Sequence, residues 1–193
     1  MRARSWLFAA TALVALAPIL GCQADKKKEY EALTRAEAAA TKLGTTLRDK
    51  MSTALEQGGA IHAIEVCSVE GQKVREEIAR ELNVKVGRSS LRLRNPADAA
   101  PDWVAVWLKA NGGKKAEKVT GTRAVVDTPG GKVARVLRPI TLEAPCVVCH
   151  GEEKGIDPAV LKAIRAKYPD DNATGYQVGD LRGAIWAELP IPR

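Results

Sequence analysis

The sequence predicts an α+β domain, in which an antiparallel sheet is flanked by helices and preceded by a long N-terminal helix. Two observations carry this prediction. Helical periodicity dominates the first part of the chain, up to about residue 82. Alternating, β-rich segments separated by turn residues fill much of the rest, with short helical segments between them.

The long helix is predicted from Tyr30 to Ala54, because apolar residues recur there at three- and four-residue steps. We expect it to pack on the core, and a coiled-coil dimer is the alternative. Gly58-Gly59 marks a boundary, after which residues 60–82 are again helical. On this segment Cys67 lies on the apolar stripe, whereas His62 is about 140° away from it.

The remaining elements follow from alternation and turn signals. Val84 to Arg94 alternates as a strand does, and Pro101 opens a short helix whose tryptophans are expected to pack on the core or on a cofactor. Val119 to Ile140 is predicted as a hairpin around Pro129-Gly130. Asp157-Pro158 begins a helix towards Tyr168, and residues 183–191 form a closing strand.

The N-terminus is typical of a bacterial lipoprotein. Arg2 and Arg4 precede an uncharged stretch that is too short to span a membrane and ends in Ile19-Leu20-Gly21-Cys22. We predict a signal peptide at 1–21, lipidation of Cys22, a tether at 22–29 and a single domain at 30–193; an ordinary signal peptide or an uncleaved anchor is the alternative. Gln23 after the cysteine favours the outer membrane over the inner one.

The charge balance is mildly basic. Removal of the signal peptide would lower the formal net charge from +7 to +5. The basic residues are spread along the chain and no nucleic-acid module is present, so we expect no nucleic-acid partner. This charge suits an acidic redox partner protein or a membrane surface.

The most specific motif is Cys146-Val147-Val148-Cys149-His150. A C-x-x-C-H run is the attachment signal for a c-type haem, in which the two thiols bind the vinyl groups and the histidine supplies an axial nitrogen. A zinc site would need further ligands, and a thioredoxin-like pair would need a βαβ context and a helix after the first cysteine. The pentad instead is expected in a loop, because it stands between Ala144-Pro145 and Gly151.

Cys67 is the one cysteine that export, lipidation and haem attachment leave over. An unpaired thiol in an oxidising compartment is either a small buried hydrophobe or a metal ligand. The helical periodicity predicts that Cys67 points inward, but it does not distinguish between these two roles.

Several longer motifs resemble one known family. They comprise Ala63-Ile64-Glu65-Val66-Cys67-Ser68, residues 87–96 with Asp102-Trp103, the haem pentad, Tyr168-Pro169, Ala173-Thr174-Gly175-Tyr176 and residues 179–184. Together they resemble the Tll-type family of exported, PAS-like c-type haem domains over about residues 30–190. Asp98, where the family often has Asn, and Val104, where it often has Glu, depart from the pattern.

The resemblance implies a PAS-like antiparallel sheet holding one covalent haem c. It also implies that Cys67 is the second axial ligand, opposite His150. Arg88, Arg92, Arg94 and Arg182 are candidate partners for the haem propionates, and solvated surface charges are the alternative for each.

These features predict a periplasmic, membrane-anchored haem protein that carries electrons at low potential or senses redox state or a gas such as CO or NO. A thiolate ligand favours ferric iron, and small molecules would bind only after one ligand leaves. We expect a carrier or sensor rather than an enzyme. A haem peroxidase is the alternative; it would need a distal acid–base group, and His62 faces away from Cys67.

Overall fold

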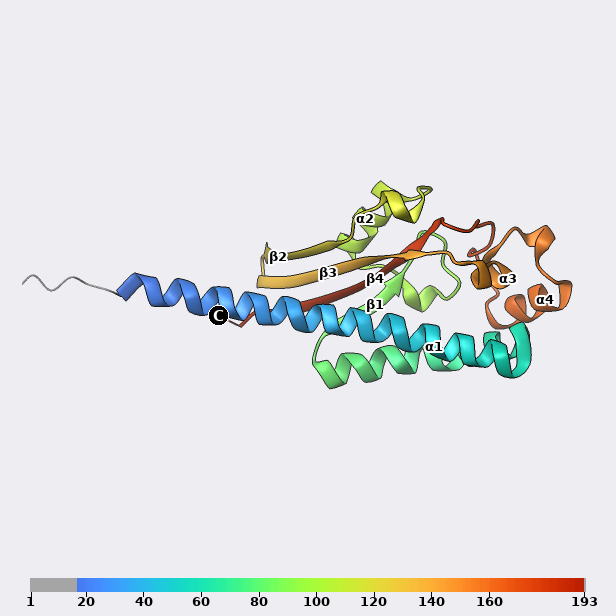
Figure 1. The fold of residues 1–193 in the computed structure, drawn as a ribbon, viewed down its shortest axis with the longest axis horizontal. Coiled ribbons are helices and arrows are strands. Elements are labelled where there is room, and N and C mark those ends of the chain that lie inside the picture. The colour runs from blue at the N-terminus through green and yellow to red at the C-terminus, as the bar shows by residue number, and fades with distance from the viewer. Residues whose placement is uncertain (1–16, 193) are drawn as a thin grey trace, which may run out of the picture.

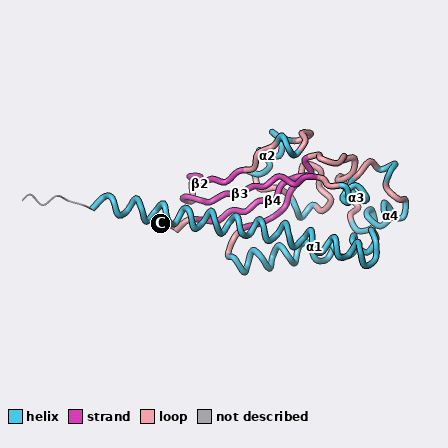
Figure 2. Tube along the Cα trace, viewed as in Figure 1, coloured by secondary structure: helices cyan, strands magenta, loops and turns pink. Residues whose placement is uncertain are grey.

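The structure is a computed structural model that describes residues 17–192. Most of the predicted signal peptide lies outside these residues, and so does the side chain of Cys22. Within the part described, no helix combines the length and the apolarity that a membrane crossing requires. The elements form three layers, with a helical hairpin and a short helix on opposite faces of one sheet (Figures 1 and 2).

The helical hairpin is α1, Ala17–Leu82, which reverses direction at Gly58 and Gly59. Gly59 has φ 69° and ψ −168°, a conformation that only glycine adopts without strain. The two arms then lie side by side, joined by an ion pair of 2.6 Å between Lys42 and Glu81 (Figure 1). The boundary predicted at Gly58-Gly59 is confirmed, and it returns Cys67 towards the end of the sheet.

The sheet has four antiparallel strands in the order β1-β4-β3-β2. Their bounds are Lys85–Ser89 for β1, Thr122–Thr128 for β2, Gly131–Thr141 for β3 and Leu181–Pro190 for β4. The predicted hairpin is confirmed, with Thr128 paired to Gly131 across the Pro129-Gly130 turn. The last strand lies in the middle of the sheet, between β1 and β3.

The strand predicted over 84–94 is shorter than expected. Pairing with β4 ends at Ser89, and the following residues bond to a loop near residue 175 instead. Asn172 N donates to Leu93 O at 2.9 Å, and the Ser90 and Tyr176 hydroxyls lie 3.3 Å apart. These partners are about 80 residues away, so local alternation could not reveal the end of the strand.

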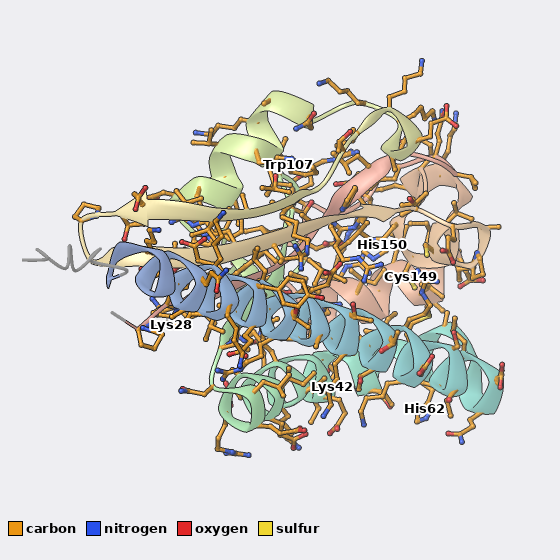
Figure 3. All side chains as sticks on the ribbon, turned by 60° about the vertical axis from the view of Figure 1, so that its left-hand side comes forward. Lys28, Lys42, His62, Trp107, Cys149 and His150 are labelled. Atoms are coloured by element: carbon orange, nitrogen blue, oxygen red, sulfur yellow. The ribbon has the colours of Figure 1, made fainter. Side chains whose placement is uncertain are left out.

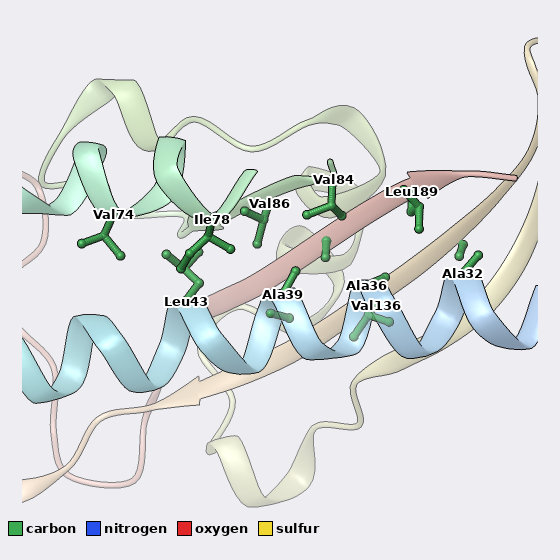
Figure 4. Packing of buried hydrophobic residues seen from close by; sticks show 13 residues of the cluster. Ala32, Ala36, Ala39, Leu43, Val74, Ile78, Val84, Val86, Val136 and Leu189 are labelled. Atoms are coloured by element: carbon green, nitrogen blue, oxygen red, sulfur yellow. The ribbon is translucent and has the colours of Figure 1, made fainter. Parts of the chain in front are cut away.

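The main core lies between α1 and the sheet. Small residues of the first arm, including Ala32, Ala36 and Ala39, let the helix approach β3 and β4 closely, and Leu43 fills the space between the arms (Figure 4). All four are at most 5% exposed. Core packing of this helix is therefore confirmed.

The opposite face of the sheet is covered by α2, Asp102–Asn111. Val104 and Leu108 are buried against Leu137 of β3, and Trp103 meets Trp186 edge to face at 6.2 Å between ring centroids. The tryptophans of α2 thus pack on the core, one of the two surroundings expected for them.

The segment between β3 and β4 forms the end of the molecule that holds the candidate site. Its longest helix is α4, Pro158–Lys167, and Asp157 caps it as predicted, at 2.7 Å from Ala159 N. Val160 and Ile164 of α4 are buried against Ile64 of α1, so α4 braces the returning arm of the hairpin.

The prediction that Cys146-Val147-Val148-Cys149-His150 lies in a loop is wrong, because this segment is helical. A 3-10 turn, Ala144–Cys146, runs directly into one α-helical turn, α3, Val147–His150. Pro145 has the backbone angle that a first helical turn needs, and Gly151 N closes the turn on Val147 O at 2.9 Å.

Candidate haem site

A cavity of about 760 Å³ opens at the end of the sheet, between both arms of α1, the end of β3 and α3. This volume lies within the roughly 300–1,000 Å³ of small-molecule and cofactor sites. Its lining includes Cys67, Cys146, Cys149 and His150, which come from segments about 80 residues apart. His62 does not line the cavity and lies far from Cys149 and His150 (Figure 3).

The ring of His150 is fixed by a backbone carbonyl. Its Nδ1 lies 2.7 Å from Ala173 O, and because a carbonyl only accepts, Nδ1 carries the proton. Burial, together with the charges of Arg182 and Arg94, lowers the pKa of His150 well below its ordinary value. The imidazole is therefore neutral, with the lone pair of Nε2 free to bind a metal.

Cys67, Cys146 and Cys149 are half-buried free thiols. Burial raises the pKa of Cys67 and of Cys149, although the charge of Arg94 opposes the rise at both. Cys146 and Cys149 are three residues apart on one helical turn, so both can face the same side. Among the residues whose side chains the structure describes, no three histidine, cysteine or acidic side chains are grouped closely enough to hold a metal ion by themselves.

Two of the four arginines expected as propionate partners already have carboxylate partners. Arg94 Nε lies 3.1 Å from Asp171 Oδ1, and Arg88 Nε lies 3.3 Å from Asp98 Oδ2. Asp98, one of the two departures from the family pattern, thus neutralises a cation of the cavity wall.

Arg182 lines the cavity differently. Its Nη1 donates to Arg92 O at 3.2 Å, but its buried Nε has no hydrogen-bond partner within the described chain. Burial lowers the pKa of Arg182 to about 10, which leaves it charged at neutral pH. Arg92 does not line this cavity; it stacks 3.7 Å from the centroid of Tyr176 and donates to Thr174 O.

Comparison with known families settles the relationship. The Tll0287-like family model matches residues 25–190, which is most of the chain. The chain belongs to the Tll0287-like family. The resemblance inferred from the sequence motifs is thereby confirmed.

A solved structure supports the same fold for this Tll0287-like chain. The crystal structure described as that of the cyanobacterial haem protein Tll0287 aligns with a TM-score of 0.60 at 23% identity, covering 93% of this chain and 99% of that one. The α+β fold class predicted from the sequence is confirmed. Comparison with curated proteins finds no match.

The donor set of this Tll0287-like chain fits a haem. Two thiols and one neutral imidazole with a free Nε2 stand on one short helical segment, and the unpartnered Nε of Arg182 suits an anionic group in the cavity. Gly71, one turn after Cys67, also lines the cavity and leaves room in front of α1.

Sequence reasoning missed residues that complete the site. The carbonyl of Ala173 orients His150, Asp171 binds Arg94, and Tyr168 lines the wall. Asp171 stands among the motifs that carry the resemblance, between Tyr168-Pro169 and Ala173. Its pairing with Arg94 spans 77 residues and leaves no local pattern.

Proposed function

We propose that this chain is an exported c-type haem protein that transfers electrons or senses redox state through one covalent haem c. Cys146 and Cys149 form the thioether links, His150 is one axial ligand and Cys67 is the other. The observation that carries the proposal is the meeting of these four side chains at one cavity of cofactor size. The relative described as a haem protein supports it.

The bound haem supplies a one-electron iron couple whose potential the axial ligands and surrounding charges set. The chain's own groups have separate tasks. Ala173 O holds the Nδ1 proton of His150, so that Nε2 is always the ligating nitrogen. The buried guanidinium of Arg182 binds a propionate carboxylate and offsets its charge.

The role is that of a carrier or sensor rather than an enzyme. In the proposed site, His150 and Cys67 would occupy both axial positions of the iron. This arrangement suits electron transfer without bond breaking. If Cys67 leaves the reduced iron, a gas such as CO can bind and the protein acts as a sensor. Tight CO binding to the ferrous protein would favour sensing, and fast reduction without CO binding would favour the carrier. Peroxide turnover would instead favour the peroxidase alternative.

We further propose that lipid chains at Cys22 anchor the protein on the periplasmic side of the outer membrane, where it meets a redox partner protein. In support, residues 23–27 are exposed, and the first arm of α1 extends beyond the sheet towards its N-terminus (Figure 1). Two acyl chains suffice for stable attachment. Cys22→Ala should release the protein from washed membranes.

The decisive experiment uses protein matured in a host that attaches c-type haem. We expect haem to remain on the chain through denaturing electrophoresis, and the intact mass to exceed that of the polypeptide by one haem. The mass of the bare polypeptide would overturn the proposal.

Spectra of Cys67→Ala then test the second ligand. Ser68→Ala is the matched control, because its hydroxyl donates to Glu65 O and Ser68 does not line the cavity. The low-spin ferric spectrum should be lost in Cys67→Ala and kept in Ser68→Ala. An unchanged Cys67→Ala spectrum would show that Cys67 is not a ligand.

A further inference from the structure

The loop at residues 171–176 holds His150 at two points. Tyr176 N donates to the main-chain oxygen of His150 at 3.0 Å, and the His150 ring donates to Ala173 O at 2.7 Å. Gly175 N also donates to Gly151 O at 2.7 Å. The orientation of the imidazole therefore depends on where this loop lies.

Several contacts hold the loop, among them Asn172 N donating to Leu93 O and Arg92 donating to Thr174 O, and one of them is an ion pair. Asp171 Oδ1 accepts a hydrogen bond from Ala173 N at 3.0 Å. Arg94 donates to both oxygens of this carboxylate, from Nε to Oδ1 at 3.1 Å and from Nη2 to Oδ2 at 3.3 Å. The same Nη2 donates to Cys149 O. Arg94 thus binds the residue before His150 and, through Asp171, the residue that accepts the proton of the His150 ring.

The pair is more enclosed than any other ion pair in the described chain, with the Asp171 side chain 6% exposed and that of Arg94 14%. A carboxylate at this depth would be costly without its partner, and two parallel hydrogen bonds fix its direction. The direction of Asp171 in turn fixes the peptide at Ala173.

We infer that Arg94 and Asp171 form a positioning pair for His150 as an axial ligand, acting through the backbone of Ala173. The inference rests on the proposed function. Outer partners of a metal-binding histidine commonly change metal affinity by about 10- to 100-fold when removed. A pair with a merely structural role would change stability and leave ligation by His150 unaltered.

A second, partly buried ion pair provides the control. Arg135 Nε lies 2.7 Å from Glu188 Oε2 on the sheet, with side-chain exposures of 22% and 16%, and neither residue lines the cavity. Glu188→Ala therefore removes a comparable ion pair without touching the surroundings of His150.

The experiment titrates the ferric haem-loaded protein with imidazole, which competes with the protein's own ligands, and follows the absorption spectrum. Asp171→Ala should lower the imidazole concentration at half conversion by about 10- to 100-fold. Asp171→Asn keeps an oxygen for Ala173 N but loses the oxygen that receives Arg94 Nη2, so its half-conversion concentration should lie between those of wild type and Asp171→Ala, whereas Glu188→Ala should match wild type.

Two results would overturn the inference: Asp171→Ala that titrates as wild type does, or Glu188→Ala that shifts as far as Asp171→Ala. Should Asp171→Ala fail to accumulate, Arg94→Gln, which frees the carboxylate from its anchor, must shift the titration at least about threefold, within the same range of effects. Absence of covalent haem in the wild type would instead refute the proposed function.

Discussion

Gly71 makes the shape of the cavity testable. It lies inside the second arm of α1, one turn after Cys67, and lines the cavity. A Cβ there would be 3.5 Å from Arg88 Nη2, an ordinary contact. Gly71→Ala should therefore raise the free energy of unfolding by about 0.5–1 kcal/mol, because alanine loses less backbone entropy in a helix.

A large side chain at the same position should act on the cofactor instead. Gly71→Trp would direct an indole into the space in front of α1, and overfilling a packed site costs about 1–3 kcal/mol. If that cost falls on ligation by Cys67, the equilibrium constant for binding of Cys67 to the iron drops about 5- to 140-fold.

The assay compares the low-spin fraction of the ferric protein by absorption and electron paramagnetic resonance. Val69→Trp is the matched control, since Val69 is on the same arm, is 52% exposed and does not line the cavity. A wild-type spectrum in Gly71→Trp, or an equal loss in Val69→Trp, would refute the idea that the haem occupies this side of the cavity.

Three further predictions concern stability and potential. Leu43→Ala should cost about 2–5 kcal/mol in denaturant unfolding, because Leu43 is buried between the arms, and Val178→Ala, which is exposed, should stay within about 0.5 kcal/mol. Asp157→Ala should cost about 1 kcal/mol through loss of the α4 cap, and no change in thermal unfolding would contradict this assignment. Asp98→Asn should raise the midpoint potential by less than about 40 mV, because it leaves the half-exposed Arg88 unpaired beside the cavity; a lower potential in redox titration would contradict it.

The elements best predicted from the sequence are those with a local signal. The reversal at Gly58-Gly59, the Pro129-Gly130 turn and the Asp157 cap each depend on residue types within a few positions. The inward direction of Cys67 followed from helical periodicity over one arm, and the structure places that side chain at the cavity. The prediction that the strand continues after Ser89 is wrong, because the end of the strand is set by hydrogen bonds to a loop distant in sequence.

The site divides in the same way. Thiols and imidazoles are visible in a sequence because few residue types can bind a cofactor, whereas the group that orients His150 is a main-chain carbonyl, which every residue carries. Only the fold determines which carbonyl lies opposite Nδ1. Here the fold does so by pairing Arg94 with Asp171 across 77 residues. If the proposed ligation holds, a chain that kept the pentad and Cys67 but lost Asp171 would hold the same iron less firmly. On the proposed function, the motif supplies the ligand and the distant ion pair sets its direction.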